Sequence, residues 1–129
     1  MIKLATSLSV FLIVGVRIAD AATDWLTTID RFARADAAAS VGANPAPPLR
    51  QSFVTNYEAT VARAKVQLKQ QYPTYSDSTL TELVRQRAKR GTDGVAMLLK
   101  QKGCRSAEIN SLLGDYQKLA GGEIGRAHV

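Results

Sequence analysis

The apolar residues of this chain recur every three or four positions, and this period limits its fold more than any other feature. The clearest run ends directly before Pro73 and consists of Leu49, Phe53, Tyr57, Val61, Ala64, Leu68 and Tyr72. Residues three and four apart lie on one side of an α-helix, whereas a half-buried strand alternates apolar and polar residues. No segment shows a convincing alternation of that kind. We therefore expect an all-α chain, folded as a small bundle of about five helices.

The first predicted helix covers residues 22–39, and a Pro-rich strap at residues 40–48 separates it from the others. Trp25 and the apolar residues that follow it at helical spacing form its buried face, and Thr23 can cap its start. The strap reads SVGANPAPP, a composition that is extended and semi-rigid rather than helical. Pro48 suits the first turn of the next helix, where its missing N–H is not needed.

Residues 49–122 are predicted to form a basic helical domain that holds the other four helices. After the long helix, residues 79–82 have the S/T-x-x-E form of a capping box, so we expect a short helix from there to Gly91. A second short helix then ends at Gly103, and Ser106 caps the last one. We expect the whole bundle to pack through Trp25, Phe32, Phe53, Tyr57, Leu68, Leu83, Leu98, Leu112 and Leu113.

The N-terminus has the form of a secretory signal. Lys3 supplies a positive charge, thirteen uncharged and mostly apolar residues follow as far as Val16, and Ala19-Asp20-Ala21 has the small-x-small form of a cleavage site. The apolar run is shorter than the roughly 17 to 25 residues of a membrane span. We expect residues 1–21 to be a signal peptide and the protein to be periplasmic or extracellular. The alternative is an uncleaved segment that anchors the chain in the membrane.

The last seven residues, 123–129, match a translation of the start of a common short-read sequencing adapter, followed in this frame by a stop codon. We therefore expect an adapter-derived artefact tail and a natural chain that is truncated near Gly122. The tail contains His128, the only histidine. Without it the sequence offers no histidine as a general base or a metal ligand.

Positive charge is concentrated in one part of the chain. Residues 22–122 contain 14 Lys and Arg against 9 Asp and Glu, and residues 49–105 alone contain 11 against 4. In an exported protein this favours an anionic polymer, a membrane surface or an acidic protein as partner. Nucleic acid is disfavoured, because no aromatic residues alternate with the charges to stack on bases. The candidate binding residues are Arg63, Lys65, Lys69, Arg85, Arg87, Lys89, Arg90, Lys100, Lys102 and Arg105. The alternative is that these basic residues only form a solvated helical surface and bind no partner.

Cys104 is the only cysteine, so the sequence predicts no disulfide framework. In an oxidising compartment, two interpretations stay open for this residue. It forms a disulfide with a cysteine beyond Gly122 or with another chain, or it is a free thiol. The oligomeric state cannot be derived from the sequence.

No catalytic, cofactor or metal motif is present. Glu108 and Asp115 lie seven residues apart, about 10 Å along a helix, which is too far for most paired-carboxylate chemistry. Residues 95–114 resemble the first half of a helix-turn-helix, but residues 115–120 are too short for a recognition helix. The sequence therefore favours an exported binding or scaffold protein. The alternatives are the N-terminal fragment of a secreted enzyme whose catalytic part is lost by truncation, and a membrane-anchored helix-turn-helix DNA-binding protein.

Overall fold

A computed structural model describes residues 24–122, which form four α-helices and no strand. The helices are α2 (Trp25–Gly42), α3 (Pro47–Gln71), α4 (Asp77–Lys102) and α5 (Ala107–Ala120). The predicted all-α class and the small helical bundle are confirmed. The predicted signal peptide at 1–21 and the predicted tail at 123–129 lie outside the described residues. None of the helices in residues 24–122 combines the length and the apolar composition needed to cross a membrane.

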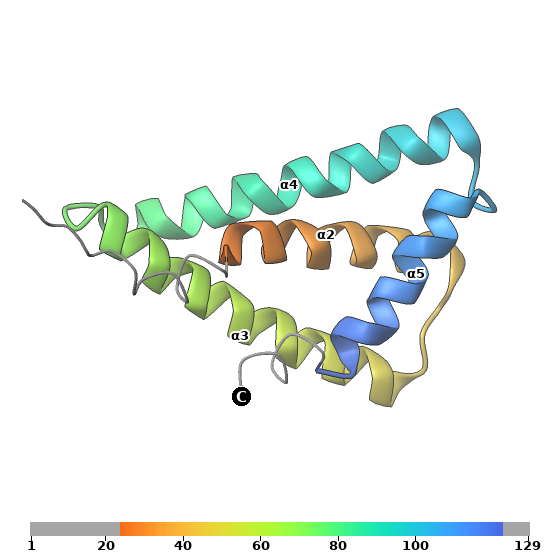
Figure 1. The fold of residues 1–129 in the computed structure, drawn as a ribbon, viewed down its shortest axis with the longest axis horizontal. Helices are drawn as coiled ribbons and strands as arrows, with labels where there is room; N and C mark the ends of the chain where they lie inside the picture. The colour runs from red at the N-terminus through yellow and green to blue at the C-terminus, as the bar shows by residue number, and fades with distance from the viewer. Residues whose placement is uncertain (1–23, 123–129) are drawn as a thin grey trace, which may run out of the picture.

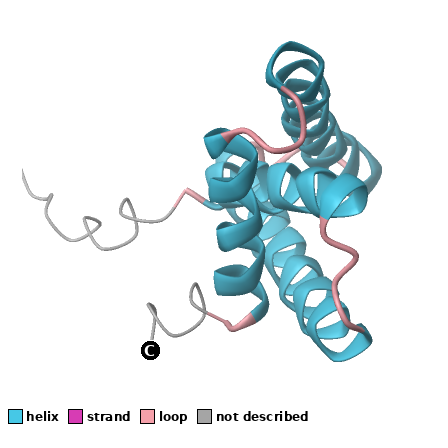
Figure 2. Cartoon of the chain, turned by 90° about the vertical axis from the view of Figure 1, so that its right-hand side faces the viewer, coloured by secondary structure: helices cyan, strands magenta, loops and turns pink. Residues whose placement is uncertain are grey.

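The four helices form a triangle around a central helix (Figure 1). α3 and α4 diverge from the turn at residues 72–76, and α5 crosses their open end, from the end of α4 to the start of α3. α2 lies inside this triangle and packs against all three of the other helices. Figure 2 shows that the helix axes point in clearly different directions, so this is not an aligned up-and-down bundle.

The central helix has the predicted length of 18 residues but is shifted by three residues toward the C-terminus. Asp24, rather than Thr23, provides its N-cap, because its Oδ1 accepts a hydrogen bond of 3.1 Å from the backbone N–H of Leu26. α2 then continues to Gly42, three residues beyond the predicted end, since the alanine run favours a helix. The predicted strap at 40–48 shrinks to residues 43–46, because Pro47 and Pro48 both belong to the first turn of α3.

A single long helix, α4, replaces the two short helices predicted on either side of Gly91. That glycine is buried in the middle of α4, where a methyl group would lie 2.9 Å from Oδ1 of Asp30 and 3.3 Å from Cβ of Ala33 on α2. Gly91 therefore lets two helices approach closely and does not end one. Consequently the described residues hold four helices, and the predicted count of five was too high.

The predicted capping box at residues 79–82 was also wrong. Ser76 caps α4, and its Oγ accepts a hydrogen bond of 3.2 Å from the backbone N–H of Thr79. Glu82 is turned to Arg85 instead, with 2.6 Å between Oε2 and Nη2. The helix thus begins three residues earlier than the pattern indicated. By contrast, the predicted end of α4 at Gly103, which has a φ of 82°, and the predicted Ser106 cap of α5 are confirmed.

The core is built around α2. Phe32 packs against Phe53 and Tyr57 of α3, and the rings of Phe53 and Tyr116 stack with centroids 4.0 Å apart. Of the nine predicted core residues, Phe32, Phe53 and Leu68 are buried, and the other six are partly buried. Small side chains let the neighbours of α2 come close; the buried alanines of this helix are Ala33, Ala35, Ala38 and Ala39.

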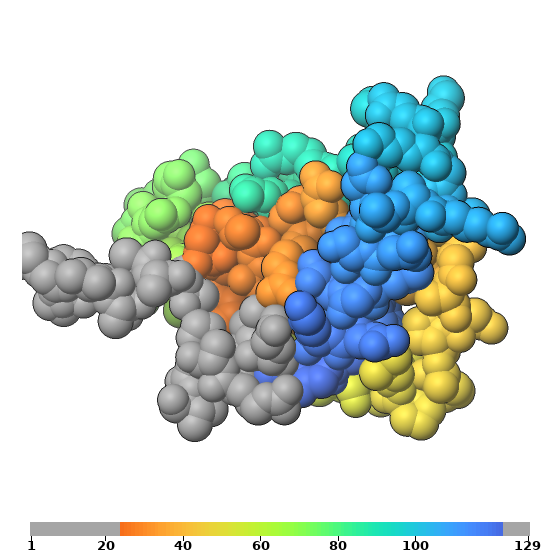
Figure 3. Space-filling model, turned by 45° about the vertical axis from the view of Figure 1, so that its right-hand side comes forward, coloured from red at the N-terminus to blue at the C-terminus, as the bar shows by residue number. Residues whose placement is uncertain are grey.

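One side of α2 still reaches the surface, between α4 and α5 (Figure 3). On α2, Nε of Arg34 donates to Oδ2 of Asp30 at 2.9 Å, and Nη2 of Arg31 reaches across to Oδ1 of Asp115 on α5 at 3.0 Å. The second pair links the central helix to the helix that closes the triangle. Both pairs are only partly buried and remain in contact with water, so each contributes little free energy, and the apolar core holds the triangle together.

Candidate functional site

The ten basic residues predicted to bind an anionic partner differ in what they contact. Four of them are neutralised by ion pairs. These pairs join Lys65 to Asp77 (2.8 Å), Arg85 to Glu82 (2.6 Å), Lys89 to Asp93 (2.8 Å), and Lys102 to Glu108. A basic side chain that already holds a carboxylate presents little net charge to a partner, so the charge available for binding is smaller than the sequence count implies.

The other six candidates have no carboxylate partner within residues 24–122; they are Arg63, Lys69, Arg87, Arg90, Lys100 and Arg105. Arg63 lies over the ring of Trp25, 5.1 Å from the ring centroid, which is cation–π geometry. Nζ of Lys69 donates to the backbone oxygen of Tyr75 at 2.8 Å. The remaining four positive charges are therefore the ones most open to an external anion.

Two of these four line one pocket, and we call it the tyrosine–arginine pocket. Arg87 and Arg90 contribute from α4, and the cavity has a volume of about 250 Å³. Its apolar lining comes from three helices through Leu26, Leu68 and Leu83, and its other lining residues are Gln71, Tyr72, Tyr75 and Gln86. Sequence reasoning chose the two arginines for their charge but missed the pocket, because its parts come together only when α2, α3 and α4 pack.

Lys100 and Arg105 lie at the other end of α4 and in the turn that follows it. Arg87 and Lys100 are thirteen residues apart, so about 20 Å of helix separates them at 1.5 Å per residue. The predicted binding residues thus do not converge on one point. Three of them, Arg63, Lys65 and Lys69, lie on α3, and the other seven are spread along α4 and the turn after it.

The carboxylates considered for catalysis have structural partners. Nη2 of Arg31 donates to Asp115, and Nζ of Lys102 donates to Glu108. The hydrogen bond from Lys102 holds the pKa of Glu108 below its usual range, and the one from Arg85 does the same for the pKa of Glu82. Both carboxylates are therefore held as ion-pair partners of basic side chains.

Three groups with raised pKa values belong to α2, α3 and α5. Desolvation raises the pKa of Asp36, and the charge of Arg50 opposes this shift. Burial raises the pKa of Tyr57 and Tyr116, and the charge of Asp36 adds to both shifts. Tyr57 and Tyr116 pack against the phenylalanine rings described above, so their pKa shifts follow from core packing.

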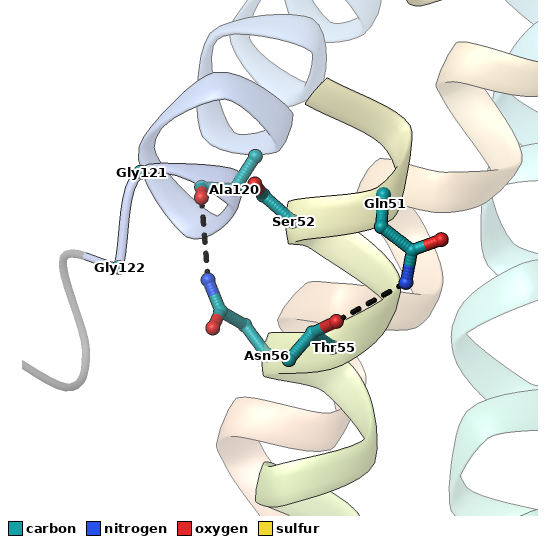
Figure 4. Close-up of a pocket in the computed structure, with 7 residues that line it drawn as sticks. All are labelled: Gln51, Ser52, Thr55, Asn56, Ala120, Gly121 and Gly122. Atoms are coloured by element: carbon teal, nitrogen blue, oxygen red, sulfur yellow. Dashed lines mark hydrogen bonds between the residues drawn. The ribbon is translucent and has the colours of Figure 1, made fainter. Parts of the chain in front are cut away.

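Figure 4 shows a polar pocket where the end of α5 meets α3. Nδ2 of Asn56 donates to the backbone oxygens of Leu119 at 2.8 Å and Ala120 at 3.3 Å, and Gln51 donates to Thr55 at 3.3 Å. Carbonyls at the end of a helix have no partner within it, so Asn56 acts as a cap from another helix. No local sequence signal marks this role, because the partners are more than sixty residues apart.

The structure also locates the cysteine and the resemblance to a helix-turn-helix that were noted in the sequence. Cys104 is an exposed, free cysteine in the turn between α4 and α5. α5 runs through Gly114 without a turn, so within the described part of the chain the predicted half motif is not followed by a second helix of a helix-turn-helix. In residues 24–122, no three His, Cys, Asp or Glu side chains come together as metal ligands.

Comparison with known proteins assigns no family. No protein-family model, curated protein or solved structure matches this chain.

Proposed function

We propose that the protein is an exported binding or scaffold protein that holds an anionic polymer along α4, without catalysis in the visible chain. The observation that carries this proposal is the set of four basic side chains without a carboxylate partner in residues 24–122, namely Arg87, Arg90, Lys100 and Arg105. Export rests on the signal-like residues 1–21.

The spacing of these charges favours an extended partner. About 20 Å of helix separates Arg87 from Lys100, which is beyond the reach of one small anion. Arg87 and Arg90 are three positions apart and lie on one side of α4, whereas Lys100, ten positions after Arg90, lies about 80° around the helix from it. An extended anionic chain of about six residues covers 20 Å, since each residue adds at most about 3.5 Å.

Membrane surfaces and acidic proteins fit this distribution less well than a polymer does. Arg87 and Lys100 are thirteen positions apart and lie about 140° from each other around α4, so a flat surface engages only part of the charge. A flexible chain can follow the charges around and along the helix. An ion contact at the protein surface is weak, so several contacts must add together to hold the polymer. Salt screens such contacts, so binding should weaken steeply as the salt concentration rises.

The test is the affinity of the full chain for a fluorescent glutamate dodecamer, measured by anisotropy at several salt concentrations. Replacing Arg87, Arg90, Lys100 and Arg105 with Gln should weaken binding at least tenfold and flatten the salt dependence. The matched control replaces both members of two ion pairs, as Glu82→Gln with Arg85→Gln and Lys89→Gln with Asp93→Asn, and leaves the net charge unchanged. Salt-insensitive binding, or equal losses in the two variants, would contradict the proposal.

Export is tested separately. A reporter that is active only outside the cytoplasm, fused after residue 122, should be active with residues 1–21 present and inactive without them. Activity of a cytoplasmic reporter at the same position would refute export. This second result would leave the polymer-binding measurement unaffected.

A further inference from the structure

We infer that the tyrosine–arginine pocket is a binding site for a small aromatic anion, a molecule with a ring and one carboxylate or similar anionic group. This inference goes beyond polymer binding, because a polyanion needs only charge and this pocket also offers an apolar lining. Its geometry combines a stacked tyrosine pair, a leucine lining and two arginines in one cavity.

The leucine lining fits the apolar part of such a ligand. Leu68 is buried, while Leu26 and Leu83 are partly buried and come from the two neighbouring helices. Apolar surface that stays in contact with water gains free energy when a ring covers it. A volume of about 250 Å³ is close to the lower end for small-molecule pockets, so the ligand is limited to about two fused rings.

The tyrosine pair is held ready for stacking. The rings of Tyr72 and Tyr75 are nearly parallel, at 13°, with centroids 4.7 Å apart, and 42% and 37% of these residues are exposed. The turn between them is fixed by two hydrogen bonds, from the backbone N–H of Tyr75 to the oxygen of Tyr72 and from Nζ of Lys69 to the oxygen of Tyr75. A ligand ring therefore meets aromatic faces whose position costs little to fix on binding.

The two arginines supply the recognition of the anion. Arg87 and Arg90 are three residues apart, so they are neighbours on one side of α4, and both line the cavity. Neither has a carboxylate partner in residues 24–122. A guanidinium can bind a carboxylate with two parallel hydrogen bonds, and this interaction strengthens at the wall of an apolar cavity.

The probes for the test are 2-naphthoate and its neutral analogue 2-naphthamide, titrated into the full chain and followed by NMR. We expect naphthoate to bind at least tenfold more tightly than naphthamide, and to shift the side-chain amide signals of Gln71 and Gln86 in the pocket lining. Equal affinity of the two probes, no binding of naphthoate, or shifts centred on the α4–α5 turn would overturn the inference.

Single variants separate this site from the polymer surface. Arg90→Gln should weaken naphthoate binding about tenfold, and Tyr75→Ala about fivefold, because each removes one exposed part of the pocket. Lys100→Gln with Arg105→Gln serves as the control. It should leave naphthoate binding unchanged while weakening the glutamate dodecamer. Unchanged naphthoate binding in Arg90→Gln and Tyr75→Ala would overturn the pocket site, whatever the dodecamer shows.

Discussion

Replacing Gly91 with Ala tests how α2 and α4 pack. Gly to Ala in an exposed helix interior usually stabilises a protein by about 0.8 to 1 kcal/mol, because Ala has the higher helix propensity. At Gly91 the added methyl group would lie 2.9 Å from Oδ1 of Asp30, 3.3 Å from its backbone oxygen and 3.3 Å from Cβ of Ala33. The substitution therefore brings a steric conflict together with the usual gain.

The conflict at this position is hard to relieve. The backbone oxygen of Asp30 and the Cβ of Ala33 cannot rotate away, and the carboxylate of Asp30 accepts a hydrogen bond from Arg34 at 2.9 Å. Extra methyl groups in a packed core cost about 1 to 3 kcal/mol. After the gain in propensity, we expect Gly91→Ala to destabilise the protein by about 1 kcal/mol.

Gly114→Ala is the matched control. Gly114 also lies inside a helix, α5, but a methyl group there would meet nothing within 4 Å. This variant should be stabilised by about 0.8 kcal/mol. Each kcal/mol shifts the Tm of a domain of this size by about 4 to 8 °C, so thermal unfolding should place the two variants about 10 °C apart. If Gly91→Ala raises the Tm as much as Gly114→Ala does, the close approach of α2 and α4 is refuted.

Three further predictions concern caps and ion pairs. Asn56→Ala should cost about 1 kcal/mol and speed hydrogen exchange of the last amides of α5, because the backbone oxygens of Leu119 and Ala120 lose a side-chain donor and only the oxygen of Leu119 keeps a backbone donor, Gly122; unchanged exchange would exclude this cap. Ser76→Ala should lower the free energy of unfolding by about 1 kcal/mol in urea, whereas a loss seen only with Thr79→Ala would favour the capping box. The hydrogen bond from Arg85 lowers the pKa of Glu82, so its stabilisation is present above the ordinary pKa of Glu82 and is lost as the pH falls through the lowered pKa. In Arg85→Gln an NMR titration should therefore find the pKa of Glu82 raised toward its ordinary value, and an unchanged pKa would show that the pair is absent in solution.

Features that depend on neighbouring residues could be predicted from the sequence. A Pro at the start of α3, Gly103 at the end of α4 and Ser106 before α5 act through backbone groups within one helical turn. The stripe that contains Phe53 and Leu68 was found by its period for the same reason. Helical period and caps are local properties, so one sequence is enough to recognise them.

Features that depend on packing could not be predicted. Gly91 carries the same local signal as a helix end, and only its contact with Asp30 and Ala33 on α2 explains why α4 continues through it. The cap that Asn56 gives to α5 joins residues distant in the sequence.

In the candidate site, too, local features could be predicted and features that depend on packing could not. Its arginines stood out as part of a basic run, and the spacing of Glu82 and Arg85 is that of a local ion pair. The link from Lys65 to Asp77 crosses a turn, and the tyrosine–arginine pocket needs three packed helices. Which charges stay available for a partner is therefore a tertiary property.

The most direct test of the proposed function is how binding depends on the length of the anion. Glutamate oligomers of three and twelve residues differ in reach, since about six extended residues are needed to cover the 20 Å of helix between Arg87 and Lys100. At equal concentration of glutamate residues, the dodecamer should bind at least tenfold more tightly than the trimer. This advantage should disappear in Lys100→Gln with Arg105→Gln. Equal affinity per residue for the two oligomers, or an advantage that survives in the double variant, would contradict polymer binding along α4.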